Sequence, residues 1–348
     1  MTEVQQKLID AILKKVRQKC PDTVDLVGVY GSACTGDTHA KSDLDLLILI
    51  NDAKAYALAD CFILQDEGIG YDTYCTTWQM LEGDAQCNHA HLSKLMDSKI
   101  VYVRDQSVTE RLDELKKQAA DLLASDRRFE KAVEIKDQLC KQYVYAQTAD
   151  SFGKQRTFAA YIIALALDSV MIYNGKYFKK GTKRTFEELE GLNQPDNFCR
   201  NIGQIVSARN SAELGTALTD LVRAQIKFID SEISAKDKAA PSKENISGTY
   251  EEMFSNWKNK MTDAAERSDA FSSFMNLAFF QFMLEEISTE VDIPKFNVLE
   301  NYAPDNLKEN AKIFDEALER YLQEYRKAGI KPNSYANVDE YLKSYLES

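Results

Sequence analysis

The chain has 348 residues, which is enough for two or three structural modules. Its net charge of −12 argues against an extended nucleic-acid-binding surface, which would need a basic stripe, and suits a cationic or neutral small substrate better. The seven cysteines form no C-x-x-C pair and no stretch reaches the ~18 apolar residues of a membrane-spanning helix, so we expect a cytoplasmic protein with reduced thiols.

An amphipathic charged helix is predicted over residues 3–19, where apolar residues recur at helical spacing. Two apolar runs, beginning near Leu26 and near Leu44, then predict strands on either side of a segment rich in turn formers. The first run ends at Gly31 and Ser32. Glycine lets the backbone approach a ligand closely, and serine supplies a hydroxyl and an N–H group at a helix start, where anions are favoured. The pair therefore predicts a phosphate-binding turn.

Two aspartates, Asp43 and Asp45, stand at the start of the second apolar run. Because they are two positions apart on a predicted strand, their side chains leave the same face. Two carboxylates beside a phosphate-binding turn are what a Mg²⁺ ion bridging triphosphate oxygens requires. The alternative is a Gly-Ser turn before a solvent-exposed acidic strand edge, which explains poorly why five consecutive apolar residues follow.

This pattern of Gly-Ser, ten residues and then Asp-hydrophobic-Asp-hydrophobic resembles the signature of the nucleotidyltransferase superfamily, which has a polymerase β-like fold. Within that superfamily the chain is most similar to the antibiotic (aminoglycoside and lincosamide) nucleotidyltransferases and to the minimal nucleotidyltransferases. Gly36 and Ser42 match their usual form, whereas Thr35 stands where an arginine is common. The resemblance is close over residues 20–105, loose over residues 106–230 and absent after about residue 235.

The resemblance implies transfer of a nucleoside monophosphate, with ATP as the expected donor, to an acceptor hydroxyl, with release of pyrophosphate. It implies that Asp43 and Asp45 bind Mg²⁺ and that Gly31, Ser32 and Ser42 bind the nucleotide. The expected acceptor is a small hydroxylated molecule, aminoglycoside- or lincosamide-like, which would make antibiotic resistance the biological role. Two alternatives stay open: nucleotidylation of a protein or an RNA, and an antitoxin-like minimal nucleotidyltransferase that partners another chain.

Residues 53–65 predict a second helix, and the β-formers of residues 71–78 predict a third strand. Related enzymes carry a third carboxylate on this strand. Asp72 is therefore the expected third metal ligand, or the base that takes the proton from the acceptor hydroxyl. The alternative is a surface aspartate after a glycine turn, and Glu82 and Asp84 are the next candidates.

From residue 109 onward, apolar residues at helical spacing predict long helices. Segment 158–173 is strongly apolar, but Asp168 interrupts it and it is too short for a membrane span, so we predict the central helix of a bundle. A run of cations at residues 179–184 follows, and it resembles the post-helix segment of antibiotic nucleotidyltransferases, whose second domain faces the nucleotide. Lys183 is the expected contact to the triphosphate; a solvated basic turn is the alternative.

Together these elements predict an α+β fold class, with an N-terminal mixed β-sheet and flanking helices followed by an all-α helical-bundle region. The expected domains are a nucleotidyltransferase catalytic domain at residues 1–107, a helical bundle domain at residues 108–234 and an additional helical region at residues 235–348. A shift in composition to Lys, Ser, Pro and Gly around residues 235–248 predicts the linker before the last region. The sequence does not indicate an oligomeric state.

Overall fold

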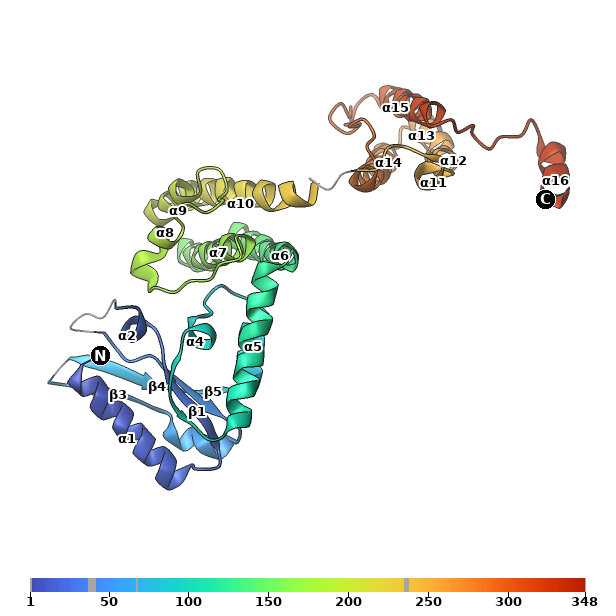
Figure 1. Ribbon diagram of the computed structural model, residues 1–348. Helices are drawn as coiled ribbons and strands as arrows, with labels where there is room; N and C mark the ends of the chain where they lie inside the picture. The colour runs from blue at the N-terminus through green and yellow to red at the C-terminus, as the bar shows by residue number, and fades with distance from the viewer. Residues whose placement is uncertain (1, 37–41, 67, 235–237, 348) are drawn as a thin grey trace. The chain divides into compact units, whose positions relative to one another are not determined.

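The computed structural model describes residues 2–36, 42–66, 68–234 and 238–347 (Figure 1). Contacts within the chain divide it into two compact units, Met1–Ile233 and Ser234–Ser348. The first unit holds a mixed β-sheet with flanking helices and a helical bundle, and the second is built of helices. The predicted α+β fold class is therefore confirmed.

A four-stranded sheet forms the centre of the first unit, in the order β5-β2-β1-β6. Strand β1 (Val24–Val29) pairs antiparallel with β2 (Leu46–Ile50) and with β6 (Lys99–Val103). Strand β5 (Cys75–Thr77) pairs parallel with β2. Every residue of β1 and β2 is buried, because helices cover both faces of the sheet, and this burial explains why the two strands are continuous apolar runs.

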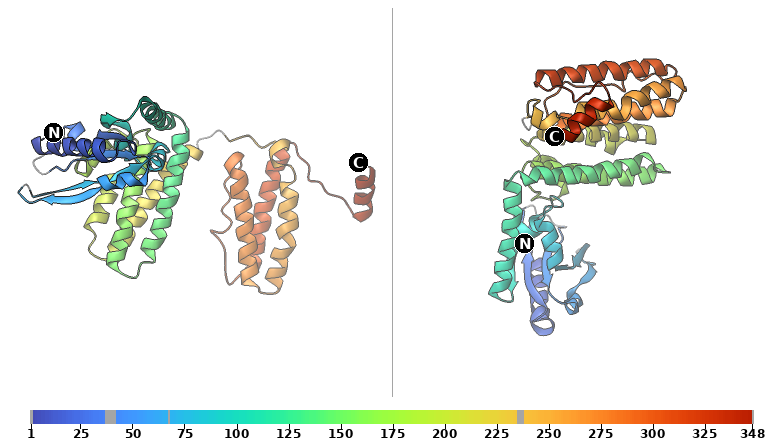
Figure 2. Two further views of the ribbon diagram at one scale, coloured as in Figure 1. Left: turned by 90° about the horizontal axis from the view of Figure 1, so that it is seen from below. Right: turned by 90° about the vertical axis from the view of Figure 1, so that its right-hand side faces the viewer.

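Alternate residues of β2 face two different helical layers. Leu46, Ile48 and Ile50 join a core with α1 (Glu3–Lys19). Leu47 and Leu49 join the larger core, to which α3 (Trp78–Ala85) and α5 (Gln106–Ala124) contribute. Figures 1 and 2 show α1 and α5 along the sheet, one on each side. This alternation fixes the register of β2 and with it the position of the residues that precede it.

Residues 53–65 were expected to form a helix, and the structure shows a different arrangement. A 3-10 helix, η1 (Ala53–Leu58), is followed by strand β3 (Asp60–Leu64). Strand β3 pairs antiparallel with β4 (Ile69–Thr73) in a separate two-stranded sheet, in which the rings of Phe62 and Tyr71 stack. Cross-strand aromatic packing of this kind favours the hairpin over a helix. The expected third strand, residues 71–78, is consequently divided between β4 and β5.

The helical part of the first unit begins with α5, which packs on α3, on α4 (Ser93–Met96) and on α6 (Arg127–Gln147). Helix α7 (Phe152–Tyr173) packs against α6 along its length. By length and composition α7 could cross a membrane, but half of its apolar window is buried inside the protein, as expected for the core helix of a bundle. The bundle is completed by α9 (Phe198–Ser207) and α10 (Ser211–Ser234), and short η2 (Thr182–Arg184) and α8 (Thr185–Glu188) lie between α7 and α9.

The second unit packs its helices, apart from the exposed α16, around a separate core that includes Phe280, Phe314, Tyr321 and Tyr325. Its helices are α11 (Lys243–Ile246), α12 (Thr249–Met253), η3 (Phe254–Lys258, a π-helix), α13 (Asn259–Glu266), α14 (Ala270–Glu290), α15 (Leu307–Lys327) and α16 (Val338–Glu347). The second unit begins at Ser234, next to the expected boundary at residue 235. The contacts within the chain do not divide the first unit near residue 107, where the other boundary was expected. Helix α5 accounts for this continuity, because it packs against elements on both sides of residue 107.

Candidate active site

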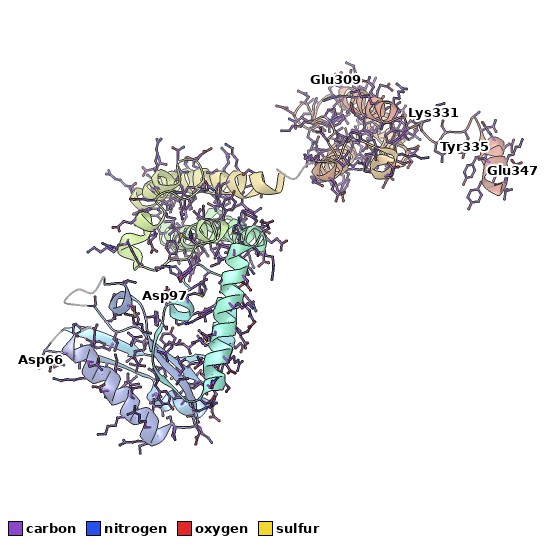
Figure 3. All side chains as sticks on the ribbon, viewed as in Figure 1. Asp66, Asp97, Glu309, Lys331, Tyr335 and Glu347 are labelled. Atoms are coloured by element: carbon purple, nitrogen blue, oxygen red, sulfur yellow. The ribbon has the colours of Figure 1, made fainter. Side chains whose placement is uncertain are left out.

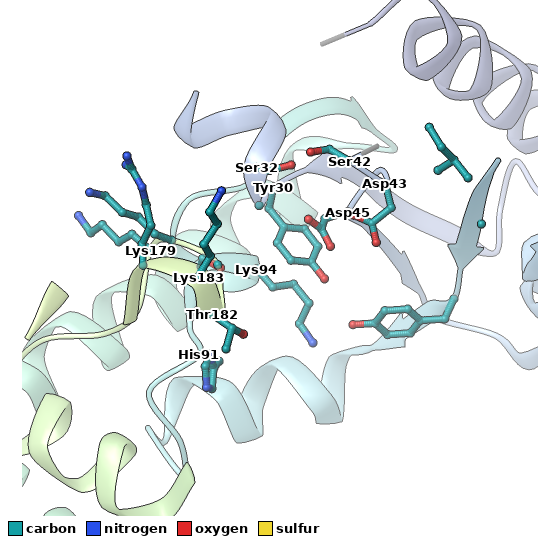
Figure 4. Close-up of a pocket in the computed structure, with 18 of the residues that line it drawn as sticks. Tyr30, Ser32, Ser42, Asp43, Asp45, His91, Lys94, Lys179, Thr182 and Lys183 are labelled. Carbon is teal, nitrogen blue, oxygen red and sulfur yellow. The ribbon is translucent and has the colours of Figure 1, made fainter. Parts of the chain in front are cut away.

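A cavity of about 1100 Å³ opens where β1 ends and β2 begins, and it is called the main cavity below (Figure 4). Six of the seven site residues predicted from the sequence line it: Gly31, Ser32, Ser42, Asp43, Asp45 and Lys183. The register of the sheet explains this meeting, because antiparallel pairing of β1 with β2 brings the end of one strand beside the start of the other. Residues 37–41 of the connecting segment lie outside the described residues.

Gly31 is the residue that allows the turn and the carboxylates to approach one another. Its φ of 66° and ψ of −145° belong to a region that only glycine adopts readily. A Cβ atom on Gly31 would overlap Oδ2 of Asp45 and would lie 2.7 Å from its Cγ. The backbone of Gly31 therefore lies directly against the Asp45 carboxylate, and the first helical residue after it is Ser32, at the start of α2 (Ser32–Thr35).

The carboxylate of Asp45 carries a charge that the protein compensates only in part. Burial and the negative charge of Asp43 both raise the pKa of Asp45, and a backbone hydrogen bond from Ser32 opposes them. Helix α1 holds the backbone at Asp43 in place, because the side-chain amide of Gln5 donates to the backbone oxygens of Asp43, at 2.9 Å, and of Ser42, at 3.3 Å. Gln5 is fully buried, and no sequence pattern predicted this role.

This pair of carboxylates fits a magnesium ion. Mg²⁺ prefers oxygen ligands and is usually bound by one or two protein carboxylates, with water and substrate phosphates completing its shell. A cation here would also relieve the repulsion that raises the pKa of Asp45. The described part of the chain shows no group of three or more His, Cys, Asp or Glu side chains that could hold a metal.

Asp72, the seventh predicted site residue, stands outside the four-stranded sheet. It lies on β4, is exposed and pairs with Cys61 across the two-stranded sheet. Its neighbours Tyr71 and Thr73 are buried, and side chains alternate along a strand, so the Asp72 carboxylate leaves the other face of β4. Gly70 and Tyr74 share the parity of Asp72 and line the main cavity, whereas Asp72 is not among the described lining residues. Its role as a third metal ligand or as a base stays a prediction.

The opposite wall of the main cavity comes from the basic segment, defined as residues 179–184 after α7. Phe178 fixes its start, since its N–H donates to the backbone oxygen of Ala90 at 2.8 Å and its ring is buried. The hydroxyl of Tyr177 donates to the carboxylate of Asp97, a residue labelled in Figure 3, at 2.9 Å. These bonds dock the segment that leaves the bundle onto the domain that carries the two aspartates.

Glu188, which follows the basic segment in sequence, holds its first two residues in place. Its two carboxylate oxygens accept hydrogen bonds from the backbone N–H groups of Lys179, at 2.9 Å, and Lys180, at 2.8 Å. Both lysine side chains line the main cavity, as do Lys183 and Arg184. Because hydrogen bonds to a charged acceptor are among the stronger ones, Glu188 fixes the backbone from which these cations project.

Lys94 is the cavity residue that sequence analysis missed most clearly. Its side chain is only 14% exposed, lies 3.3 Å from Asp84 and extends into the cavity beside Tyr30 and Asp45 (Figure 4). Asp84 is buried and also accepts a bond from His89 at 3.2 Å, which raises the pKa of His89. No local pattern marks Lys94, because its position depends on packing of α4 against α3 and α5.

One family of known proteins matches the part of the chain that carries the two aspartates. Residues 9–119 match the family model described as a nucleotidyltransferase domain. The crystal structure of a nucleotidyltransferase-like protein from Exiguobacterium sibiricum 255-15 is 11% identical, with a TM-score of 0.36 over 80% of this chain and 90% of that chain. No curated protein matches the chain. The family match at residues 9–119 supports a general nucleotidyl transfer activity.

Proposed function

We propose that the protein transfers a nucleoside monophosphate, AMP from ATP, to a hydroxyl group of a small molecule in a Mg²⁺-dependent reaction. The observation that carries this proposal is the meeting of three features in the main cavity: the Gly31 turn, the carboxylates of Asp43 and Asp45, and the basic segment. They match the parts that nucleotidyl transfer requires, namely a phosphate-binding turn, a site for the metal and cations for the phosphates. The expected location is the cytoplasm.

In this reaction the acceptor oxygen forms a bond to the α-phosphorus of the nucleotide as the bond from that phosphorus to the β-phosphate oxygen breaks. Pyrophosphate leaves with the electron pair of the broken bond, and the proton of the acceptor hydroxyl passes to solvent water. Magnesium, when bound by Asp43 and Asp45, supplies charge neutralisation and lowers the pKa of the attacking hydroxyl. Lys94 and Lys183 line the same cavity and are placed to neutralise the departing pyrophosphate.

The size of the main cavity supports two bound molecules. Small-molecule pockets typically have volumes of about 300–1,000 Å³. At about 1100 Å³, the main cavity exceeds this range, which suits a nucleotide together with an acceptor. The rings of Tyr30 and Tyr74 and the side chain of Ile69 add apolar surface to the lining, against which a base or a sugar can pack. An aminoglycoside- or lincosamide-like acceptor, and with it a role in antibiotic resistance, rests on the resemblance of the sequence alone.

Calorimetric titration tests the proposal. Wild-type protein and the Asp43→Asn/Asp45→Asn double variant are titrated with ATP, GTP, CTP and UTP, each with Mg²⁺ and again with EDTA. We expect Mg²⁺-dependent binding of at least one nucleotide to the wild type, with ATP preferred, and its loss in the double variant. Thermal unfolding of both proteins controls for misfolding. Absence of binding to the folded wild type, or equal binding by the double variant, would refute the proposal.

A further inference from the structure

The charge of the main cavity differs from that of the whole protein. Although the chain carries a net charge of −12, the described residues that line the cavity include more basic than acidic side chains. The basic ones are Lys94, Lys179, Lys180, Lys183 and Arg184, and the acidic ones are Asp43, Asp45 and Glu187. A substrate inside the cavity experiences these nearby charges more strongly than the distant ones, which salt screens over about 10 Å.

Each of the three acidic side chains already has a charge partner or a proposed one. Asp43 and Asp45 face the position proposed for Mg²⁺. The Glu187 carboxylate lies 3.7 Å from Nζ of Lys180 and 3.5 Å from Nε of Arg184. Among the described lining residues, therefore, no carboxylate is left to bind an ammonium group of an acceptor.

The bound nucleotide does not reverse this balance when two Mg²⁺ ions accompany it. A triphosphate brings about four negative charges, and each Mg²⁺ brings two positive ones. Lys94 is paired with the buried Asp84, so the lining side chains contribute about one positive charge, and the filled cavity carries about one negative charge with one Mg²⁺ and about one positive charge with two. With two Mg²⁺ ions, a polycationic acceptor would enter without a counter-charge, whereas an anionic acceptor would meet an attractive field.

Lys179 is placed to meet an anionic acceptor. Figure 4 shows it on the side of the main cavity away from Asp43 and Asp45, with Lys183 nearer to them. Lys179 also lines a smaller adjoining cavity of about 230 Å³, to which Lys99 contributes a second cation. The described lining of that smaller cavity contains one carboxylate, Asp97, so its two lysines leave about one positive charge in excess.

We propose that the acceptor is an anionic hydroxyl compound, carrying a carboxylate or a phosphate, and that Lys179 binds its anionic group. This inference rests on the proposed nucleotidyl transfer and narrows its acceptor: it favours sugar acids and sugar phosphates over aminoglycosides. Lys94 and Lys183 serve the triphosphate, and Lys179 selects the second substrate. The acceptor hydroxyl then forms the ester bond to the α-phosphorus in the reaction described above.

A matched series of sugars tests the proposal by binding. Wild-type protein saturated with Mg²⁺ and a non-hydrolysable ATP analogue is titrated with glucose 6-phosphate, glucuronate, glucose, glucosamine and a 2-deoxystreptamine aminoglycoside. We expect at least one anionic sugar to bind 10-fold or more tightly than glucose, and both amino compounds to bind no better than glucose. Comparison of the two anionic sugars then distinguishes phosphate from carboxylate recognition.

Two single variants show whether the preference comes from Lys179. Lys179→Gln should lose most of the preference for the anionic sugar, whereas Lys176→Gln, an exposed lysine outside the described cavity lining, should retain it. Any one of four results would overturn the inference. They are binding of an amino compound more tightly than the anionic sugars, equal binding of all five probes, no binding of any probe, and an undiminished preference in Lys179→Gln. Nucleotide binding is measured first, so that failure of the proposed function is seen separately from failure of this inference. If no nucleotide binds, the sugar series is repeated on the protein with Mg²⁺ alone.

Discussion

Replacing Gly31 with alanine tests the geometry of the site directly. The substitution adds one methyl group at a position where φ is 66° and where the new Cβ would overlap the Asp45 carboxylate. The methyl group cannot be accommodated without moving either the turn or the carboxylate. Since both are proposed to contact the nucleotide and its metal, the substitution should reduce stability and binding together.

The expected cost has two parts. Forcing a residue other than glycine into this backbone region costs about 1–3 kcal/mol. Crowding a filled space with an extra methyl group costs about 1–3 kcal/mol more, so the free energy of unfolding should fall by about 2–6 kcal/mol. Displacing a charged contact worth about 1.5–3 kcal/mol should weaken Mg²⁺-dependent nucleotide binding by about 10- to 100-fold.

Gly36 provides the matched control. It also has a positive φ, 78°, but a Cβ there would meet no atom of the described residues within 4 Å. Gly36→Ala should therefore show backbone strain alone, about 1–2 kcal/mol, with nucleotide binding nearly unchanged. Urea denaturation and calorimetry on the two variants and the wild type give both quantities. If Gly31→Ala unfolds and binds nucleotide as Gly36→Ala does, the close approach of Gly31 to Asp45 is wrong.

Three further predictions concern the carboxylates and the histidine around the site. Asp45→Asn should abolish Mg²⁺-dependent nucleotide binding in calorimetry, whereas Asp72→Asn should bind as the wild type does, because Asp72 is not among the described cavity residues; equal losses would place Asp72 in the metal site. Glu188→Gln should weaken nucleotide binding by about 3- to 10-fold, since an amide can accept only one of the two N–H bonds that fix the basic segment, and an unchanged Kd contradicts this role. The hydrogen bond to Asp84 raises the pKa of His89 above its ordinary value of 6.5, so the folded protein holds this proton more tightly than the unfolded chain does. The resulting stability is present below pH 6.5 and lost as pH rises through the raised value; His89→Asn should flatten this part of the pH dependence of the urea midpoint, and identical profiles in both proteins would count against it.

Five of the site residues that the sequence identified lie within one short stretch of chain, and Lys183 comes from the distant basic segment. Gly31, Ser32, Ser42, Asp43 and Asp45 are predicted to lie together because two adjacent strands and their connection bring them there, and the structure shows all five at one cavity. Their chemistry depends on local requirements: a glycine conformation, a hydroxyl, and carboxylates at a spacing of two. Such requirements leave a pattern in consecutive residues.

Asp72 shows where such local inference stops. The β-rich context predicted a strand, and the resemblance to enzymes that carry a third carboxylate on this strand suggested that Asp72 lies on the main sheet. Whether the strand that carries Asp72 joins the main sheet or a separate hairpin depends on its pairing partner. Residues 60–64, which were expected to be helical, form strand β3 and supply that partner. Strand propensity does not name the partner strand, because side-chain packing across strands decides it.

The charge balance of the cavity depends largely on tertiary structure. From its net charge of −12 the chain was expected to take a cationic or neutral substrate, and only Lys183 of the basic segment was expected to contact the triphosphate. Packing of α4 and of the basic segment brings Lys94 and Lys179 into the cavity as well. By itself the sequence determined the strand-turn-strand signature, its two aspartates and the α+β class, because these follow from spacing and periodicity. Only the fold decided which distant side chains complete the site, because the local field depends on distances in space rather than on positions along the chain.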